Sequence, residues 1–154
     1  MTKDILLTIS GLQFDAVNTE GDAANEPIEV VTPASYYKKD GKHFILYDEM
    51  EEGMADITKN EIKISPDSVV VTKTGLVNAI ITFEEKRKTT TVYETPYGRF
   101  MLGITSGKIS QTESEDHIHV DLEYMLDVNY QPLAACNLRL DVDPRTHTGQ
   151  VLEQ

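Results

Sequence analysis

Apolar and polar residues alternate along most of the chain, most regularly over residues 116–128. From Ile118 onward apolar residues take the even positions, and from His117 onward polar residues take the odd positions, apart from Met125. Successive side chains of a β-strand point to opposite faces, so this pattern predicts a strand with one buried and one solvated face. The residues expected to face inward are Ile118, Val120, Leu122, Tyr124, Leu126 and Val128.

The same alternation recurs in shorter segments separated by turn residues. Residues 136–143 repeat it after a turn at 129–132, where Pro132 cannot donate to a ladder. Asp40-Gly41 stands between two β-rich runs and predicts a tight hairpin, because both turn residues favour positive φ. The spacing predicts about nine or ten short strands and no amphipathic helix, with the acidic segment 49–60 as a loop containing at most one helical turn.

Many short strands with one polar face each are typical of a sandwich or a barrel. Closing a single sheet removes its exposed edges, which favours the barrel. We therefore predict an all-β fold, a single closed and mostly antiparallel barrel of about 8–10 strands. Residues 1–154 form one domain of ordinary size, with the core strands over about 3–143 and a polar C-terminal tail over 144–154.

The composition is that of an acidic globular protein. Among the 154 residues, 26 are Asp or Glu and 14 are Lys or Arg, and the formal net charge is −12. This charge repels phosphate backbones and argues against a nucleic-acid partner. We expect a cytoplasmic protein, because no apolar run could span a membrane and the N-terminus lacks a signal peptide. The single cysteine, Cys136, excludes an intrachain disulfide and lies on the apolar side of its strand, as an inert core thiol does.

Several short motifs recur in a recognisable order along the chain, and the most specific is Tyr93-Glu94-Thr95-Pro96-Tyr97-Gly98. Their order resembles a small bacterial family of unknown function, the YwiB-like calycin-type β-barrels. The resemblance covers roughly residues 5–142 and implies a lipocalin-like barrel in a cytoplasmic bacterial protein, but no activity. This chain has Lys73 where the resemblance implies arginine, and it has no Trp for the Gly-x-Trp motif of true lipocalins. The other motifs are Ile9-Ser10-Gly11, Tyr37-Lys38-Lys39-Asp40-Gly41-Lys42, Tyr47-Asp48-Glu49, Glu52-Gly53, Lys73-Thr74-Gly75 and Thr82-Phe83-Glu84.

His117 and His119 form a possible metal-binding pair on the polar face of one predicted strand. A His-x-His pair can chelate zinc, and Asp121 continues the same row. The alternative is a solvated polar face without a ligand. A structural zinc site takes four ligands, and the sequence offers no second cluster of His or Cys. We therefore expect no specific metal and no cofactor.

Tyr93, Tyr97 and Arg99 are the candidate ligand-binding residues. They could line a barrel mouth, with aromatic walls and one cation for an anionic ligand. The alternative is structural, because Pro96-Tyr97-Gly98 can be a bend or bulge that lets a strand curve around the barrel. We expect one end of the barrel to be filled by side chains, with any pocket at the end where these three residues lie.

Two function hypotheses from different classes remain. The first is a non-enzymatic module that binds a small apolar or amphipathic molecule in or at the barrel. The alternative is an interaction or structural protein whose barrel is filled by its own side chains and whose acidic exterior meets a basic protein partner. We do not expect an enzyme, because the sequence contains neither Gly-x-Ser-x-Gly nor a phosphate-binding glycine motif. The sequence predicts no oligomeric state.

Overall fold

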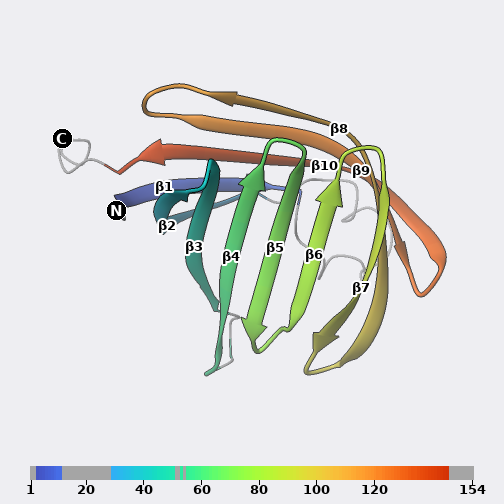
Figure 1. The fold of residues 1–154 in the computed structure, drawn as a ribbon. Coiled ribbons are helices and arrows are strands. Elements are labelled where there is room, and N and C mark those ends of the chain that lie inside the picture. The colour runs from blue at the N-terminus through green and yellow to red at the C-terminus, as the bar shows by residue number, and fades with distance from the viewer. Residues whose placement is uncertain (1–2, 12–28, 51–52, 54, 146–154) are drawn as a thin grey trace.

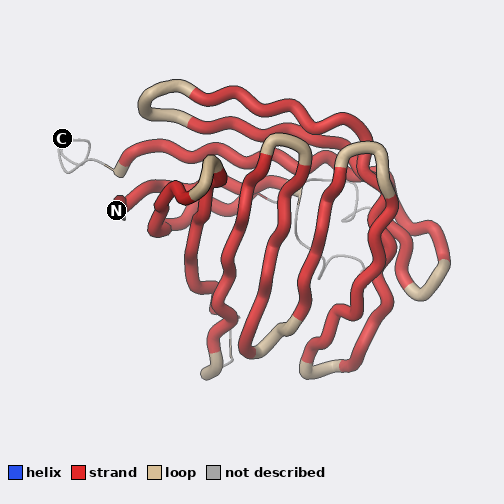
Figure 2. Tube along the Cα trace, in the orientation of Figure 1, coloured by secondary structure: helices blue, strands red, loops and turns tan. Residues whose placement is uncertain are grey.

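The computed structural model describes residues 3–11, 29–50, 53 and 55–145, and strands joined by short turns make up nearly all of this part of the chain (Figure 1, Figure 2). No helix that could cross a bilayer occurs among these residues. The strands are β1 (Lys3–Ser10), β2 (Glu29–Lys39), β3 (Lys42–Met50), β4 (Ile57–Ser65), β5 (Ser68–Gly75), β6 (Ala79–Glu84), β7 (Lys88–Thr95), β8 (Gly98–Glu113), β9 (Ile118–Val128) and β10 (Gln131–Pro144).

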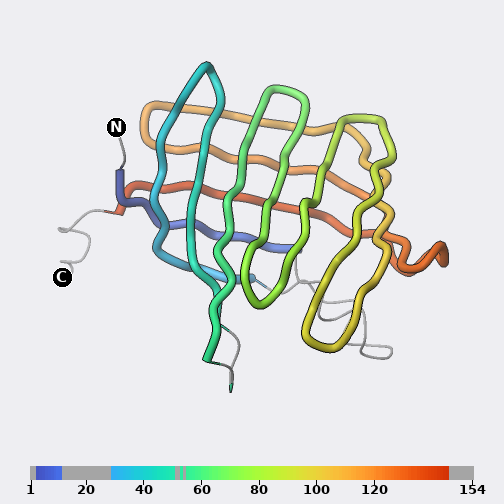
Figure 3. The backbone as a smooth tube through the Cα atoms, turned by 60° about the horizontal axis from the view of Figure 1, so that its bottom comes forward, coloured from blue at the N-terminus to red at the C-terminus, as the bar shows by residue number. Residues whose placement is uncertain are grey.

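All of these strands belong to one antiparallel sheet with the order β6-β5-β4-β3-β2-β1-β10-β9-β8-β7. Its two edge strands, β6 and β7, meet where the backbones of Asn78 and Glu94 exchange two hydrogen bonds of 2.9 Å. This contact nearly closes the sheet. Figure 3 shows the result, in which β1, β9, β10 and the second half of β8 cross the strands from β3 to β7, whereas the first half of β8 runs beside β7. The predicted all-β barrel is confirmed.

The core lies between these two crossing layers. Phe83 on β6 is fully buried and meets the ring of Tyr124 on β9 edge-on, with the ring centroids 5.0 Å apart. The predicted inward face of β9 is confirmed, because its even-numbered residues are buried as far as Leu126 and Val128 packs against the core half-buried. The other fully buried large side chains are Leu7, Ile45, Ile62, Ile64, Ile81, Leu102, Ile104, Leu122, Leu138, Leu140 and Val69.

Turn chemistry explains most of the connections. Asp40 and Gly41 both have positive φ, 53° and 76°, and join β2 to β3 in the predicted hairpin. The prediction of a loop over 49–60 is wrong at both ends. Glu49 pairs with Thr58 and Met50 with Ile57, so β3 and β4 extend into this segment. Cross-strand pairing, which local composition does not reveal, overrides the weak strand propensity of these residues.

Candidate functional site

A polar cluster occupies inward-facing positions near the end of the barrel where β3 ends and β4 begins. Lys73 on β5 is only 6% exposed, although its side chain carries an ammonium group. Its Nζ donates to Asn60 Oδ1 at 2.8 Å and forms an ion pair with Glu49 Oε1 at 3.0 Å. Asn60, itself 2% exposed, donates through Nδ2 to the same Glu49 oxygen at 3.3 Å. The buried charge is therefore paired and hydrogen-bonded, as burial of a charge requires.

Two tyrosines lie beside this cluster. Burial raises the pKa of Tyr47 far above its ordinary value, and the nearby Glu49 carboxylate and Tyr93 raise it further. The Tyr47 hydroxyl therefore stays protonated at physiological pH. Tyr93 is also buried and projects inward from β7. This end of the barrel interior thus combines a paired cation, an amide and two phenol side chains.

A pocket of about 510 Å³ lies in the barrel wall between β2 and β3. The two strands pair only over Ser35–Lys39 and Lys42–Leu46. On the N-terminal side of Ser35, β2 stays paired with β1 but no longer with β3. After Leu46, β3 stays paired with β4 but no longer with β2. The wall therefore splits between β2 and β3. Asn60 belongs both to this pocket and to the polar cluster. The pocket is lined by Asp4, Thr32, Pro33, Ala34, Ser35, Leu46, Tyr47, Asp48, Lys59, Asn60 and Arg145.

The structure does not bring Tyr93, Tyr97 and Arg99 together on one face. Tyr93 is buried and inward-facing, whereas Tyr97 is 76% exposed. Arg99 is exposed and pairs with Glu94 across the β7–β8 hairpin at 3.7 Å. Pro96 and Tyr97 form the hairpin turn itself, in which the Tyr97 N–H donates to Thr95 Oγ1. The motif is therefore a tight turn between two strands rather than a bend or bulge within one strand, and of the three residues only Tyr93 projects into the interior.

His117 and His119 project from the outer face of β9 toward acidic residues of β10. His117 Nδ1 lies 2.6 Å from Asp143 Oδ1, and its Nε2 lies 3.3 Å from Asp141 Oδ1. His119 Nδ1 lies 2.7 Å from the same Asp141 oxygen. The hydrogen bond with Asp143 is the main reason that the pKa of His117 is raised above its ordinary value. The two rings are nearly parallel, with centroids 6.5 Å apart.

A second network of hydrogen bonds and ion pairs lies at the other end of the barrel, at the β2–β3 hairpin. The Tyr36 hydroxyl lies 2.8 Å from His43 Nδ1, and His43 Nε2 lies 3.3 Å from Glu113 Oε1. Lys38 also pairs with Glu113, at 3.6 Å. These contacts tie the β2–β3 hairpin to the end of β8. Because His43 is buried among its partners, we assign this network to stability.

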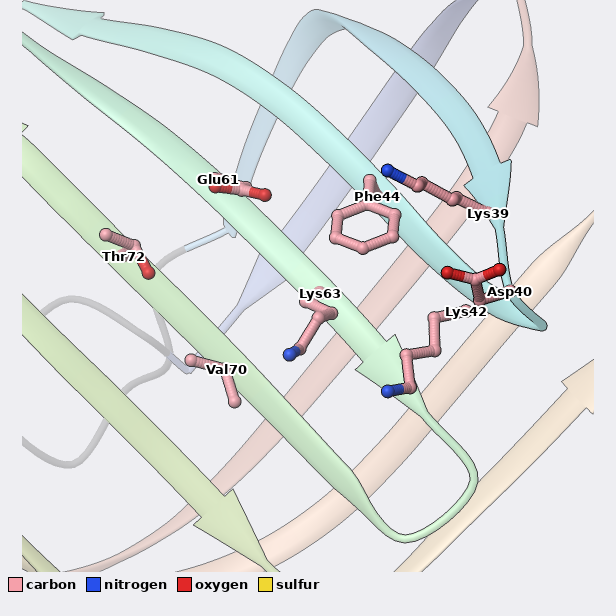
Figure 4. Close-up of a pocket in the computed structure, with 8 residues that line it drawn as sticks. All are labelled: Lys39, Asp40, Lys42, Phe44, Glu61, Lys63, Val70 and Thr72. Carbon is pink, nitrogen blue, oxygen red and sulfur yellow. The ribbon is translucent and has the colours of Figure 1, made fainter. Parts of the chain in front are cut away.

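Figure 4 shows a second pocket, of about 310 Å³, on the outer face of β2 to β5. Phe44 lies at its centre and stacks on Tyr37, with centroids 4.8 Å apart. Lysine and acidic side chains surround the ring, so the pocket is a shallow polar depression on the surface. Its lining residues are Lys39, Asp40, Lys42, Phe44, Glu61, Lys63, Val70 and Thr72.

Cys136 is half-buried and packs against the core. Burial raises the pKa of its thiol, and a smaller effect of the hydrogen bond with Tyr124 lowers it. Since the thiolate is the reactive form, we expect Cys136 to react several-fold more slowly with Ellman's reagent in the folded protein than in urea. The folded-state rate should also keep rising above the pH at which an unfolded thiol has fully ionised. Equal rates in both states at every pH would contradict this assignment.

Over the residues that the structure describes, the geometry defines a class of protein, an antiparallel β-barrel of ten strands with a polar inner end and a split in its wall. Comparison with known proteins assigns the chain to a family within this class. Residues 13–140 match the model of a domain of unknown function, DUF1934, and the chain belongs to this family. The fold is similar to that in the crystal structure of the YwiB protein from Bacillus subtilis, with a TM-score of 0.74 and 22% sequence identity over 94% of each chain. No curated protein matches the sequence.

Proposed function

We propose that this barrel is a non-enzymatic module that binds a small amphipathic molecule in the pocket between β2 and β3. The observation that carries the proposal is the split in the wall, where the pocket is lined by outward-facing residues of β2 and β3 and reaches the buried Asn60 on the inward face of β4. A pocket of about 510 Å³ has the size of ordinary small-molecule sites, which span about 300–1,000 Å³.

The lining favours an amphipathic ligand over a wholly apolar one. Pro33, Leu46 and the ring of Tyr47 offer apolar surface, whereas Lys59 and Arg145 offer charged donors. Ligand sites commonly combine apolar walls with a few polar groups that fix orientation. Asn60 forms part of the inner wall, held in place because its Oδ1 accepts from Lys73 and its Nδ2 donates to Glu49.

The same network supports binding rather than catalysis. Catalytic lysines act through a free amine. Lys73 Nζ instead donates to Asn60 and pairs with the Glu49 carboxylate. We therefore assign Lys73 to shaping the site.

A probe-binding experiment tests this function. Anilinonaphthalene sulfonate, an amphipathic anion, should bind the native protein with enhanced fluorescence. Leu46→Trp, which adds bulk at the pocket, should abolish this signal, because Leu46 lines the site while being 38% exposed and free to accept a larger ring. The matched control is Ile80→Trp, since Ile80 is an exposed aliphatic residue of β6 outside this pocket. Native mass spectrometry of fresh protein should show a retained small molecule that only Leu46→Trp loses.

Two results would overturn the proposal. One is probe binding by Leu46→Trp with the affinity of the native protein, which would place the probe elsewhere. The other is a native protein that neither binds the probe nor retains a small molecule, while circular dichroism shows it to be folded.

A further inference from the structure

The histidine pair of β9 acquires ligand partners that lie far from it in sequence. Antiparallel pairing sets Asp141 directly opposite His119, and Asp143 lies two residues further along β10. The metal-binding atoms offered by His117, His119 and Asp141 all lie within 4.8 Å of one another. Both strands are central members of the sheet, so their backbones hold these side chains in a fixed relation.

A second set of carboxylates orients the two rings. Asp143 lies 2.6 Å from His117 Nδ1, which leaves His117 Nε2 pointing at Asp141. Asp121 lies on the far side of His119, with its Oδ2 3.8 Å from Nε2. Metal-binding histidines in proteins generally direct their second ring nitrogen to such a carboxylate, which fixes the tautomer.

We propose that His117 Nε2, His119 Nδ1 and Asp141 form a binding site for a divalent zinc-class ion on the outer face of the barrel. Imidazole and carboxylate donors suit Zn²⁺, which binds them at about 2.0–2.2 Å, so tetrahedral ligands lie about 3.3 Å apart. His117 Nε2 and Asp141 Oδ1 already have this separation, 3.3 Å. His119 Nδ1 and Asp141 Oδ1 are 2.7 Å apart and need a small side-chain rotation. Water completes the coordination.

This site reverses the expectation drawn from the sequence. That expectation counted only the donors of one strand, His117, His119 and Asp121. The structure adds Asp141 as a third ligand and moves Asp121 behind His119. Asp121 is itself held by Asn137, at 2.9 Å, and by Arg139, at 3.4 Å, so it supports the site without completing it.

Zinc titration tests the proposal. Isothermal calorimetry with zinc chloride, in a non-chelating buffer at about pH 8, should show about one tight equivalent of zinc per chain. Excess Mg²⁺ is added to the buffer because it prefers oxygen ligands, and it therefore competes with zinc for the carboxylates of the acidic surface. His117→Ala/His119→Ala should remove the tight equivalent. Asp143→Asn should weaken it by about tenfold, the lower range for loss of an orienting partner.

The matched control is Glu123→Gln, an exposed acidic residue on the same strand, which should bind zinc as the native protein does. The side chains of His117 and His119 are 40% and 32% exposed, so we expect their variants to fold, and circular dichroism checks this. Absence of a tight equivalent in the native protein would overturn the site. Tight binding that survives in the folded double variant would overturn it as well, since the ligands would then lie elsewhere.

Discussion

Phe83→Ala is expected to lower the free energy of unfolding by about 3–5 kcal/mol, the cost of truncating a large aromatic side chain in a packed core. Phe83 is fully buried on β6, and its ring contacts Tyr124 of the crossing layer. Removing the ring leaves a cavity between the two crossing layers of the sheet, whose other side chains are already closely packed, so the space cannot collapse fully. Urea denaturation followed by circular dichroism measures the change.

Ile80→Ala provides the matched control. Ile80 lies on the same strand, three residues from Phe83, but its side chain faces outward and is 56% exposed. We expect its truncation to change stability by no more than about 0.5 kcal/mol, as surface substitutions usually do. An equal loss of unfolding free energy in the two variants would contradict the assignment of Phe83 to the buried face of β6 and of Ile80 to the exposed face.

The strands themselves could be predicted because their signals are local. On β9 the alternation of apolar and polar residues is nearly perfect, and the structure buries the predicted face. The Asp40-Gly41 hairpin follows from the same kind of signal, since positive φ at both residues is a property of the dipeptide. No local signal distinguished Glu49, Met50 and residues 57–60 from a loop, because their strand structure depends on pairing between β3 and β4.

The polar cluster left a signal in the sequence that alternation alone could have revealed. Lys73 follows Val69 and Val71 at the same parity, and Asn60 precedes Ile62 and Ile64 at theirs. A polar residue at an apolar position of a strand marks an inward-facing polar group. What the sequence does not show is that these residues of β4 and β5 meet Glu49 of β3, which depends on the register of three strands.

The histidine site depends on a single irregularity in β10. Gln131 pairs with Val128, but the register shifts between Pro132 and Ala134. Without this extra residue, Leu140 rather than Asp141 would lie opposite His119. The polar row of β9 would then face the apolar row of β10, with one set of side chains on the wrong face. Because of the bulge, the polar residues of β9 and β10 lie on the same face of the sheet, and Asp141 lies beside the histidines. The alternation of polar and apolar residues predicts the polar row of each strand, but it does not predict where the bulge lies.

Lys73→Ala is the second substitution with a large expected effect, a loss of about 2–3 kcal/mol in the free energy of unfolding. Removing one partner of a buried ion pair costs about 3–5 kcal/mol, because the other charge stays behind. Glu49, however, is 35% exposed, so water can solvate part of its carboxylate and the cost is smaller. Asn60 Oδ1 also loses the donor that satisfied it at 2.8 Å.

Two further variants separate the charge effect from loss of packing. Lys73→Met keeps most of the side-chain volume, so the stability it still loses measures the unpaired Glu49. Adding Glu49→Gln to Lys73→Met should recover part of that loss, because the remaining group is neutral. Lys59→Ala is the control, since Lys59 lies next to Asn60 on the exposed face of β4 and should cost no more than about 0.5 kcal/mol. If Lys73→Ala were as mild as Lys59→Ala, water would have to reach the cluster freely, and Asn60 could not be a fixed group at the inner wall of the ligand pocket.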